Sequence, residues 1–218
     1  MRPEAKSNFM KKKPQDPRKI KEDAILEAAL RVIKSKGFHK ARMADIARNA
    51  GISYGLVYHY FKTKEDLFET ILERWWESLF SLMAETRAAG EEVHKKLMRI
   101  ILFLLDTYQH HPNLVNIFIT EISRSTANLT RKRLERFKGF MTLTEEVIAE
   151  GQTQGVLRGD FKARYLTYIF LGALEAFVSA MVLVNQKIKG DAQKERIAQS
   201  ILEVFLNGAR SKKDTKQR

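Results

Sequence analysis

The sequence predicts an all-α protein of about nine helices, in which a small N-terminal three-helix unit precedes a larger helical domain. Three observations support this prediction. The 218 residues include only 4 prolines and 11 glycines, and most of them lie outside the segments whose apolar residues recur at helical spacing. Positive charge is concentrated in the first 64 residues. A short helix, a glycine turn and a second short helix are expected within residues 43–61.

Turn and capping residues bound the expected helices. Asp16-Pro17 opens the first helix, because proline fits the first helical turn, and Gly37 ends it. Gly51 supplies the next turn and Ser53 is a suitable N-cap for the helix that follows. The later helices are expected over residues 43–49, 54–61, 64–87, 92–110, 113–125, 128–154, 163–186 and 191–207.

The charge of the chain is unevenly distributed. Residues 1–64 carry 16 Lys/Arg and 6 Asp/Glu, a net charge of +10, whereas the remaining residues contribute only +3. A polyanionic partner for the N-terminal part is therefore expected, because binding to phosphates releases counterions and this release drives association.

Composition also limits the compartment and the chemistry. The chain has no cysteine, which excludes disulfides, zinc–thiolate sites and cysteine nucleophiles and suits a reducing cytoplasm. Its basic N-terminus lacks the apolar stretch of a signal peptide. The apolar segment 165–184 contains Glu175 and several small residues, so we interpret it as a buried helix of a soluble core and expect no membrane association.

The segment 43–61 fits the steric requirements of a helix-turn-helix. Two helices that cross steeply need a small residue at the crossing, and Ala47 provides it. The turn needs a residue that tolerates a left-handed backbone, and Gly51 does so. Inward apolar groups are also required; these are Ile46, Ala50, Ile52, Val57 and Tyr60. The N-terminal part of the second helix then remains accessible to a DNA major groove.

These residues closely resemble the N-terminal signature of the tetracycline-repressor (TetR) family. The resemblance spans about fifty residues and rests on Gly37-Phe38, Asp45-Ile46-Ala47, Ala50-Gly51-Ile52-Ser53, Gly55, Leu56-Val57-Tyr58-His59-Tyr60-Phe61, Lys64-Glu65 and Leu67. It implies a homodimeric transcriptional regulator, usually a repressor, that binds operator double-stranded DNA and is released by an effector bound in its C-terminal core.

The resemblance also implies which residues contact DNA. Ser53 to Leu56 resemble the residues that meet base edges, while Tyr58, His59 and Lys64 resemble those that hold phosphates. Family members usually have Thr or Ser just before the second helix, where this chain has Ala41-Arg42, so Arg42 could supply a phosphate contact instead. The full predicted DNA-binding set is Arg42, Met43, Ser53, Tyr54, Gly55, Leu56, Tyr58, His59, Lys62 and Lys64.

The C-terminal part is rich in large apolar side chains, and several of its helices are apolar on both faces, which predicts an enclosed cavity and a helix–helix dimer seam. The last two helices are the expected seam. Its predicted residues are Leu171, Leu174, Val178, Met181, Ile197, Ile201 and Phe205. The predicted organisation is a flexible basic arm (1–17), a DNA-binding domain (18–63), an effector-binding and dimerisation domain (64–209) and a flexible tail (210–218).

A second resemblance concerns the effector. Glu121-Ile122-Ser123-Arg124-Ser125, Leu129, Arg131, residues 148–155 and Leu171-Gly172-Ala173-Leu174-Glu175 look like the acyl-CoA-responsive, FadR-type regulators of fatty-acid degradation within this family. It implies ligand phosphates on arginines and an acyl chain in the aromatic core. The predicted effector-binding set is Trp75, Leu104, Tyr108, Phe118, Arg124, Arg131, Phe137, Met141 and Phe177.

Other functions are weighed against this one. A repressor of multidrug efflux that senses lipophilic compounds is the nearest alternative, and a helical nucleoid or RNA-binding protein is a more distant one. No enzyme is expected, because phosphate loops, nucleophile elbows and two-histidine helix motifs are absent from the sequence. His110-His111 fit a helix C-terminus better than a metal site, so no metal or cofactor is expected.

Overall fold

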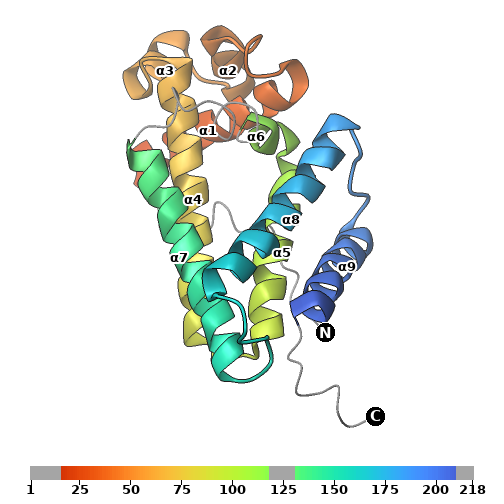
Figure 1. The fold of residues 1–218 in the computed structure, drawn as a ribbon. Helices are drawn as coiled ribbons and strands as arrows, with labels where there is room; N and C mark the ends of the chain where they lie inside the picture. Colours follow the sequence, from red (N-terminus) through yellow and green to blue (C-terminus); the bar gives the residue numbers. More distant parts are fainter. Residues whose placement is uncertain (1–15, 118–130, 210–218) are drawn as a thin grey trace, which may run out of the picture. The chain divides into compact units, whose positions relative to one another are not determined.

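The computed structural model describes residues 16–117 and 131–209, and its regular elements in these ranges are nine α-helices (Figure 1). The predicted all-α class is confirmed. The chain divides into two compact units. Among the described residues, the head unit comprises 16–79 together with 111–117, and the body unit comprises 80–110 and 131–209.

The head unit is built around its first helix. That helix, α1, packs against α2 and α6, and α2 packs against α3. The core consists of fully buried aliphatic side chains from several helices, among them Ile25, Leu26, Ile46, Val57, Leu67 and Ile71. The elements are α1 (Pro17–Lys36), α2 (Met43–Ala50), α3 (Tyr54–Tyr60), α6 (Pro112–Ile117) and the first part of α4 (Lys64–Ala88).

Side-chain caps fix where these helices start. The Asp16 carboxylate accepts a hydrogen bond from the Arg18 backbone N–H at 3.0 Å, with Pro17 in the first turn. At the start of α4, the Thr63 hydroxyl accepts from the Asp66 N–H at 3.0 Å, while the Asp66 carboxylate accepts from the Thr63 N–H at 3.1 Å. This reciprocal pair is a capping box with Asp in the place of Glu.

A charge cluster joins α1 to α4 within the head unit. The Arg74 guanidinium donates to the Glu22 carboxylate at 2.6 Å and also to the Asp23 carboxylate. The Arg74 and Asp23 side chains are both only 18% exposed. Because the guanidinium presents its donors in a planar fork, one arginine can hold both carboxylates and fix the direction of α4 against α1.

The body unit contains the rest of α4 and four further helices. The helix α7 packs along α8, α5 packs along α9, and α5 also contacts α7 and α8. Leu97, Ile100, Ile101 and Leu105 on α5 and Phe170 on α8 form a fully buried apolar core. The further helices are α5 (Val93–His110), α7 (Arg131–Thr153), α8 (Ala163–Leu183) and α9 (Asp191–Ala209).

The helix α8 carries two apolar stripes. One stripe is buried in the chain and contains Leu166, Phe170, Leu174, Val178 and Met181. The other is exposed, and its large members are Tyr165, Tyr168, Ile169 and Phe177. By length and composition alone α8 could cross a membrane, and 33% of its apolar window is buried. The buried core helix expected from the sequence therefore has one of its apolar faces uncovered in the single chain.

The observed helices differ from the expected ones mainly at their ends. The helix α8 stops at Leu183 instead of 186, because Asn185 adopts a left-handed backbone with φ of 51°. The boundary between the compact units falls inside α4, after Leu79, so the predicted boundary at residues 63/64 remains a prediction. The predicted arm (apart from residues 16 and 17) and tail lie outside the described residues.

Candidate DNA-binding surface and effector region

The turn between α2 and α3 has the geometry that a helix-turn-helix requires. Gly51 adopts a left-handed backbone, with φ of 67° and ψ of 28°, which a residue with a side chain adopts only with strain. The Ile52 N–H donates to the Ala47 carbonyl at 3.1 Å. These features end α2 and redirect the chain into α3.

The N-terminus of α2 lacks a side-chain cap. Arg42 occupies the N-cap position in an extended conformation and makes no capping hydrogen bond. The first amides of α2 therefore lack the Thr or Ser oxygen that would otherwise satisfy one of them. The Arg42 side chain is exposed, which leaves its guanidinium accessible to an anion.

The helix α3 turns one face inward and presents the other to solvent. Val57 is completely buried, whereas Tyr54 is 53% exposed and Gly55 and His59 are also exposed. The Ser53 hydroxyl accepts from the Leu56 N–H at 3.4 Å, so Ser53 is the N-cap expected from the sequence. Apart from its chain neighbours and the backbone of its own helix, no atom lies within 4 Å of the position of a Cβ at Gly55. The exposed start of α3 is thus open for close approach of a partner.

Two tyrosines stand one turn apart on this helix. The Tyr54 hydroxyl donates to the Tyr58 hydroxyl at 3.1 Å, and the ring centroids are 4.8 Å apart. This hydrogen bond is the main cause that raises the pKa of Tyr58 above its usual value of 10.0. The Tyr58 phenol therefore remains neutral at physiological pH, and both hydroxyls can donate or accept hydrogen bonds.

Lys64 is engaged within the head unit. Its ammonium donates to the Phe38 carbonyl at 3.0 Å and to the His39 carbonyl at 3.4 Å, and it lies 4.6 Å from the Phe38 ring centroid. To bind a phosphate as expected, the Lys64 ammonium would have to donate to the phosphate in addition to these carbonyls, or give up its hydrogen bonds to them.

Other predicted DNA-binding residues differ in accessibility. Lys62 is exposed and Leu56 half-buried, but Met43 is 7% exposed and faces the core. Met43 is therefore better placed to pack α2 than to touch DNA. Sequence reasoning noted Lys40 and Arg48 only as part of the basic charge, and both are exposed beside α2. Lys36 instead donates to Asp45, and this hydrogen bond lowers the pKa of Asp45.

The structure separates the predicted effector-binding residues. Leu104 and Tyr108 lie on α5, Arg131, Phe137 and Met141 on α7, and Phe177 on α8, all in the body unit. Trp75 belongs to the head unit, where its ring packs against Trp76 at 5.0 Å between centroids. Phe118 and Arg124 lie outside the described residues. The structure therefore places six of the nine on three mutually contacting helices.

Within those six residues the environments differ. Tyr108 is buried and its hydroxyl donates to the Gln186 carbonyl at 2.5 Å, and burial raises its pKa. Phe137 and Phe177 are 45% and 39% exposed, whereas Leu104 and Met141 are half-buried. The Arg131 side chain is 94% exposed and pairs with Glu135 at 2.9 Å. The side chains of Arg131, Phe137 and Phe177 are therefore accessible to a ligand, whereas Tyr108 belongs to the buried core of the body unit.

The predicted dimer residues are mostly internal to the chain. Leu174, Val178, Met181 and Phe205 are 1–7% exposed, so they form the core of the body unit. Leu171, Ile197 and Ile201 are half-buried. The predicted set does not include the exposed stripe of α8 or Val204 on α9, which is 76% exposed. The small residues Gly172, Ala173, Ala176 and Ala180 of α8 are also exposed.

An exposed tyrosine-bearing helix behind a glycine turn, joined to an all-helical body with an uncovered apolar stripe, defines the class of helix-turn-helix transcriptional regulators. Residues 25–71 match the bacterial regulatory proteins of the tetR family, and residues 73–206 match the C-terminal region of YsiA-like proteins. The chain belongs to the tetR family and is a DNA-binding transcriptional regulator.

Curated relatives and solved structures cover most of the chain. The fatty acid metabolism regulator protein of Bacillus subtilis is 26% identical over 86% of this chain and 95% of its own length. The transcriptional repressor NicS of Pseudomonas putida is 28% identical over 72% of this chain and 75% of its own.

Two solved structures are similar in fold. FadR of Bacillus halodurans matches with a TM-score of 0.70 at 25% identity over 91% of this chain and 98% of that one. FadR of Bacillus subtilis in complex with stearoyl-CoA matches with a TM-score of 0.71 at 25% identity, over 85% of this chain and 98% of that one. The weaker, FadR-type resemblance in the sequence is confirmed.

Proposed function

We propose that this protein is a homodimeric repressor that leaves its operator when a long-chain acyl-CoA binds to its body unit. The observation that supports this most directly is the similarity to FadR of Bacillus subtilis, a structure that contains stearoyl-CoA. That similarity extends over 85% of the chain and therefore includes the C-terminal part as well as the DNA-binding head. The first curated relative reported above is named as a regulator of fatty acid metabolism, so efflux sensing is not proposed.

The body unit offers side chains that suit the two ends of such a ligand. Phe137, Met141 and Phe177 provide accessible or half-buried apolar surface on α7 and α8. Arg131, at the start of α7, presents an exposed guanidinium, and guanidinium groups bind phosphates through paired hydrogen bonds. We infer that the acyl chain lies against the apolar side chains and that the coenzyme A phosphates approach the arginine end of α7.

The uncovered stripe of α8 is the proposed dimer seam. Positions 165, 169, 172, 176, 180 and 183 recur every three or four residues along the helix, and all of them are exposed. Five are apolar or aromatic and 172 is glycine, so two copies of the helix could pack closely. A dimer also supplies the two linked heads that operators with two half-sites require.

The division of labour follows from these assignments. We infer that residues 18–63 read DNA, that residues 64–209 bind the effector and the second copy, and that the protein acts in the cytoplasm as a regulator and not as an enzyme. Its curated relatives are themselves described as regulators.

A binding experiment tests the proposal. The full-length protein is titrated onto labelled DNA from upstream of its own gene, with excess random DNA as competitor. Stearoyl-CoA should release the DNA, while coenzyme A and stearate alone should not. Release by coenzyme A alone, or no release by acyl-CoA of any chain length, would refute the proposed effector. Binding that random DNA competes equally would refute a sequence-specific regulator.

A further inference from the structure

The body unit contains a cavity of about 220 Å³ that none of the predicted effector-binding residues lines. Its wall comes from one end of α4 and the middle of α7. The lining residues are Met83, Arg87, Leu143, Glu146, Val147 and Glu150. Pockets for drug-sized ligands measure about 300–1,000 Å³, so this cavity suits a smaller molecule.

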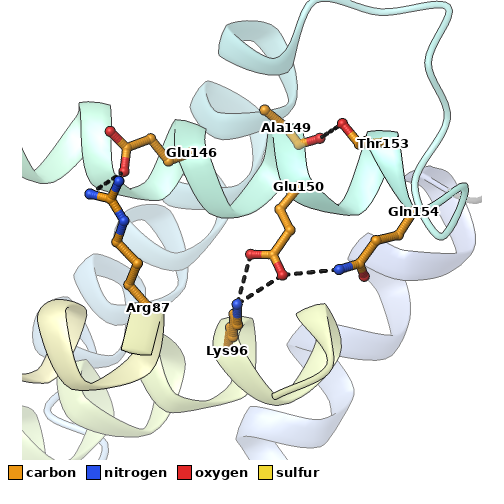
Figure 2. Close-up of polar contacts among 7 residues, drawn as sticks. All are labelled: Arg87, Lys96, Glu146, Ala149, Glu150, Thr153 and Gln154. Carbon is orange, nitrogen blue, oxygen red and sulfur yellow. Dashed lines mark hydrogen bonds and ion pairs between the residues drawn. The ribbon is translucent and has the colours of Figure 1, made fainter. Parts of the chain in front are cut away.

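The cavity combines an apolar interior with carboxylates. Met83 and Val147 are 2% and 6% exposed, and with Leu143 they provide the apolar surface. Glu146 and Glu150 stand one turn apart on α7; in Figure 2 the Glu150 carboxylate points from α7 toward Lys96, and Arg87 reaches from α4 to the Glu146 carboxylate. Carboxylates aligned in this way at an apolar wall attract a positively charged group.

The two carboxylates differ in how firmly they are held. Both Glu150 oxygens accept from the Lys96 ammonium, at 2.8 and 2.7 Å, and the Lys96 side chain is only 4% exposed (Figure 2). Glu150 also accepts from the Gln154 amide at 3.0 Å. Lys96 needs this partner because an unpaired buried ammonium is costly, so Glu150 must stay where it is.

Glu146 is paired more loosely. Its carboxylate lies 3.2 Å from the Arg87 guanidinium, and the two side chains are 46% and 71% exposed (Figure 2). Exposed ion pairs of this kind contribute little net stability. Arg87 can therefore turn into solvent, and Glu146 can accept another cation at the mouth of the cavity.

The sign of the ligand charge follows from the lining. The cavity wall carries two carboxylates and one guanidinium, and the guanidinium belongs to the exposed Arg87. Lys96 is not among the lining residues, and its ammonium is held by Glu150. A bound anion would face both carboxylates, whereas an ammonium group would gain Glu146 as its partner.

We propose that this cavity binds a small organic cation with an apolar body. The ammonium group replaces Arg87 on Glu146, and the apolar body lies among Met83, Leu143 and Val147. Its lining shares no residue with the set proposed for acyl-CoA, so the two proposals are tested independently. A ligand bound here contacts both α4 and α7.

Calorimetric titration of the full-length protein at neutral pH tests the site with three matched probes: hexylamine, hexanol and hexanoate. Hexylamine should bind saturably below about 10 mM, and hexanol and hexanoate should bind about tenfold more weakly or not at all, because charge-assisted hydrogen bonds are the stronger ones. Hexanoate binding as tightly as hexylamine, or no saturable hexylamine binding, would overturn the proposal.

Variants locate the binding. Glu146→Gln should weaken hexylamine binding about tenfold, while Arg87→Ala, which removes the competing guanidinium, should tighten it. Leu143→Phe, at a half-buried position, should abolish binding by filling the cavity. Glu77→Gln removes an exposed carboxylate elsewhere on α4 and should leave binding unchanged. Equal hexylamine affinities of the Glu146→Gln and Glu77→Gln variants would show that hexylamine binds elsewhere and would refute the assignment.

Discussion

The Tyr54 hydroxyl donates a hydrogen bond to the Tyr58 hydroxyl at 3.1 Å on the exposed face of α3. The two phenols are hydrogen-bonded to each other in the absence of DNA, and both belong to the helix that we propose to contact the operator. A base or phosphate can replace either partner without leaving a buried polar group unpaired, because neither residue is fully buried.

Tyr54 is therefore expected to contribute to sequence recognition. Tyr54→Ala should weaken operator binding by about 5- to 150-fold, the range of a lost base contact of ~1–3 kcal/mol, with the loss appearing as poorer discrimination against random DNA. Because Tyr54 is 53% exposed, the free energy of unfolding should change by less than about 0.5 kcal/mol. Competitive mobility-shift titration measures the first effect and urea denaturation the second. An unchanged specificity ratio would show that α3 is not the reading helix.

Lys64 and Lys62 should behave differently although both are basic residues at the end of the head. Lys62→Ala removes an exposed charge, so it should reduce the slope of log affinity against log salt by about 1 if Lys62 neutralises a phosphate. Lys64→Ala also removes the hydrogen bonds to the Phe38 and His39 carbonyls and should cost about 1 kcal/mol of stability.

Salt-dependent binding and thermal unfolding of the two variants separate these roles. Equal unfolding temperatures for Lys62→Ala and Lys64→Ala would show that the contacts with residues 38 and 39 contribute nothing to stability.

Arg74 should be important for the stability of the head. Arg74→Met leaves the Glu22 and Asp23 carboxylates, which are only 32% and 18% exposed, without their cation and should cost about 2–4 kcal/mol. Arg74→Lys should recover only part of this loss, because an ammonium cannot reproduce the planar fork. In urea denaturation, Arg74→Met combined with Asp23→Asn should be less destabilised than the sum of the single variants. Strict additivity would argue against the interaction.

The head was predicted well because its signals are local. Gly51 and Ser53 act through their own backbone and the next few residues, so their roles in turning and capping the chain follow from sequence. Lys64 does not fit this pattern, since its partners lie 25 and 26 residues away. Contacts over such a distance depend on the packed fold and leave no pattern in neighbouring residues.

The exposed face of α8 was harder to predict because α8 is apolar nearly all round. Periodicity could identify a helix with two apolar faces, but it could not tell which face its own chain covers. Leu174 and Met181 belong to the covered face, whereas Tyr165 and Ile169 belong to the exposed one. The choice is made by α5, α7 and α9, which pack against α8 from distant parts of the sequence.

Mutation of Lys96 and mutation of Glu150 should change the free energy of unfolding by different amounts, because only the Lys96 side chain is deeply buried. Glu150→Gln leaves the Lys96 ammonium, at 4% exposure, without an anionic partner and should cost about 3 kcal/mol. Lys96→Met should cost less, because Glu150 is 36% exposed and keeps the Gln154 amide. The double variant should be more stable than Glu150→Gln alone. Chemical denaturation checks this order, and a Glu150→Gln protein as stable as the wild type would contradict it.

The exposed stripe of α8 should hold the dimer together. Ala176→Glu places a carboxylate on an exposed position of that stripe, where it would be desolvated between the two copies, and should weaken dimerisation about 100-fold or more. Val156→Glu introduces the same charge at an exposed apolar residue between α7 and α8 and serves as the matched control. Analytical ultracentrifugation should give monomers only for Ala176→Glu at micromolar concentration.

The Ala176→Glu variant should keep the wild-type helix content in circular dichroism. It should bind a two-half-site operator far more weakly, because one head alone cannot engage both half-sites. If Ala176→Glu remained dimeric while Val156→Glu dissociated, the seam would have to be placed near the α7–α8 connection instead.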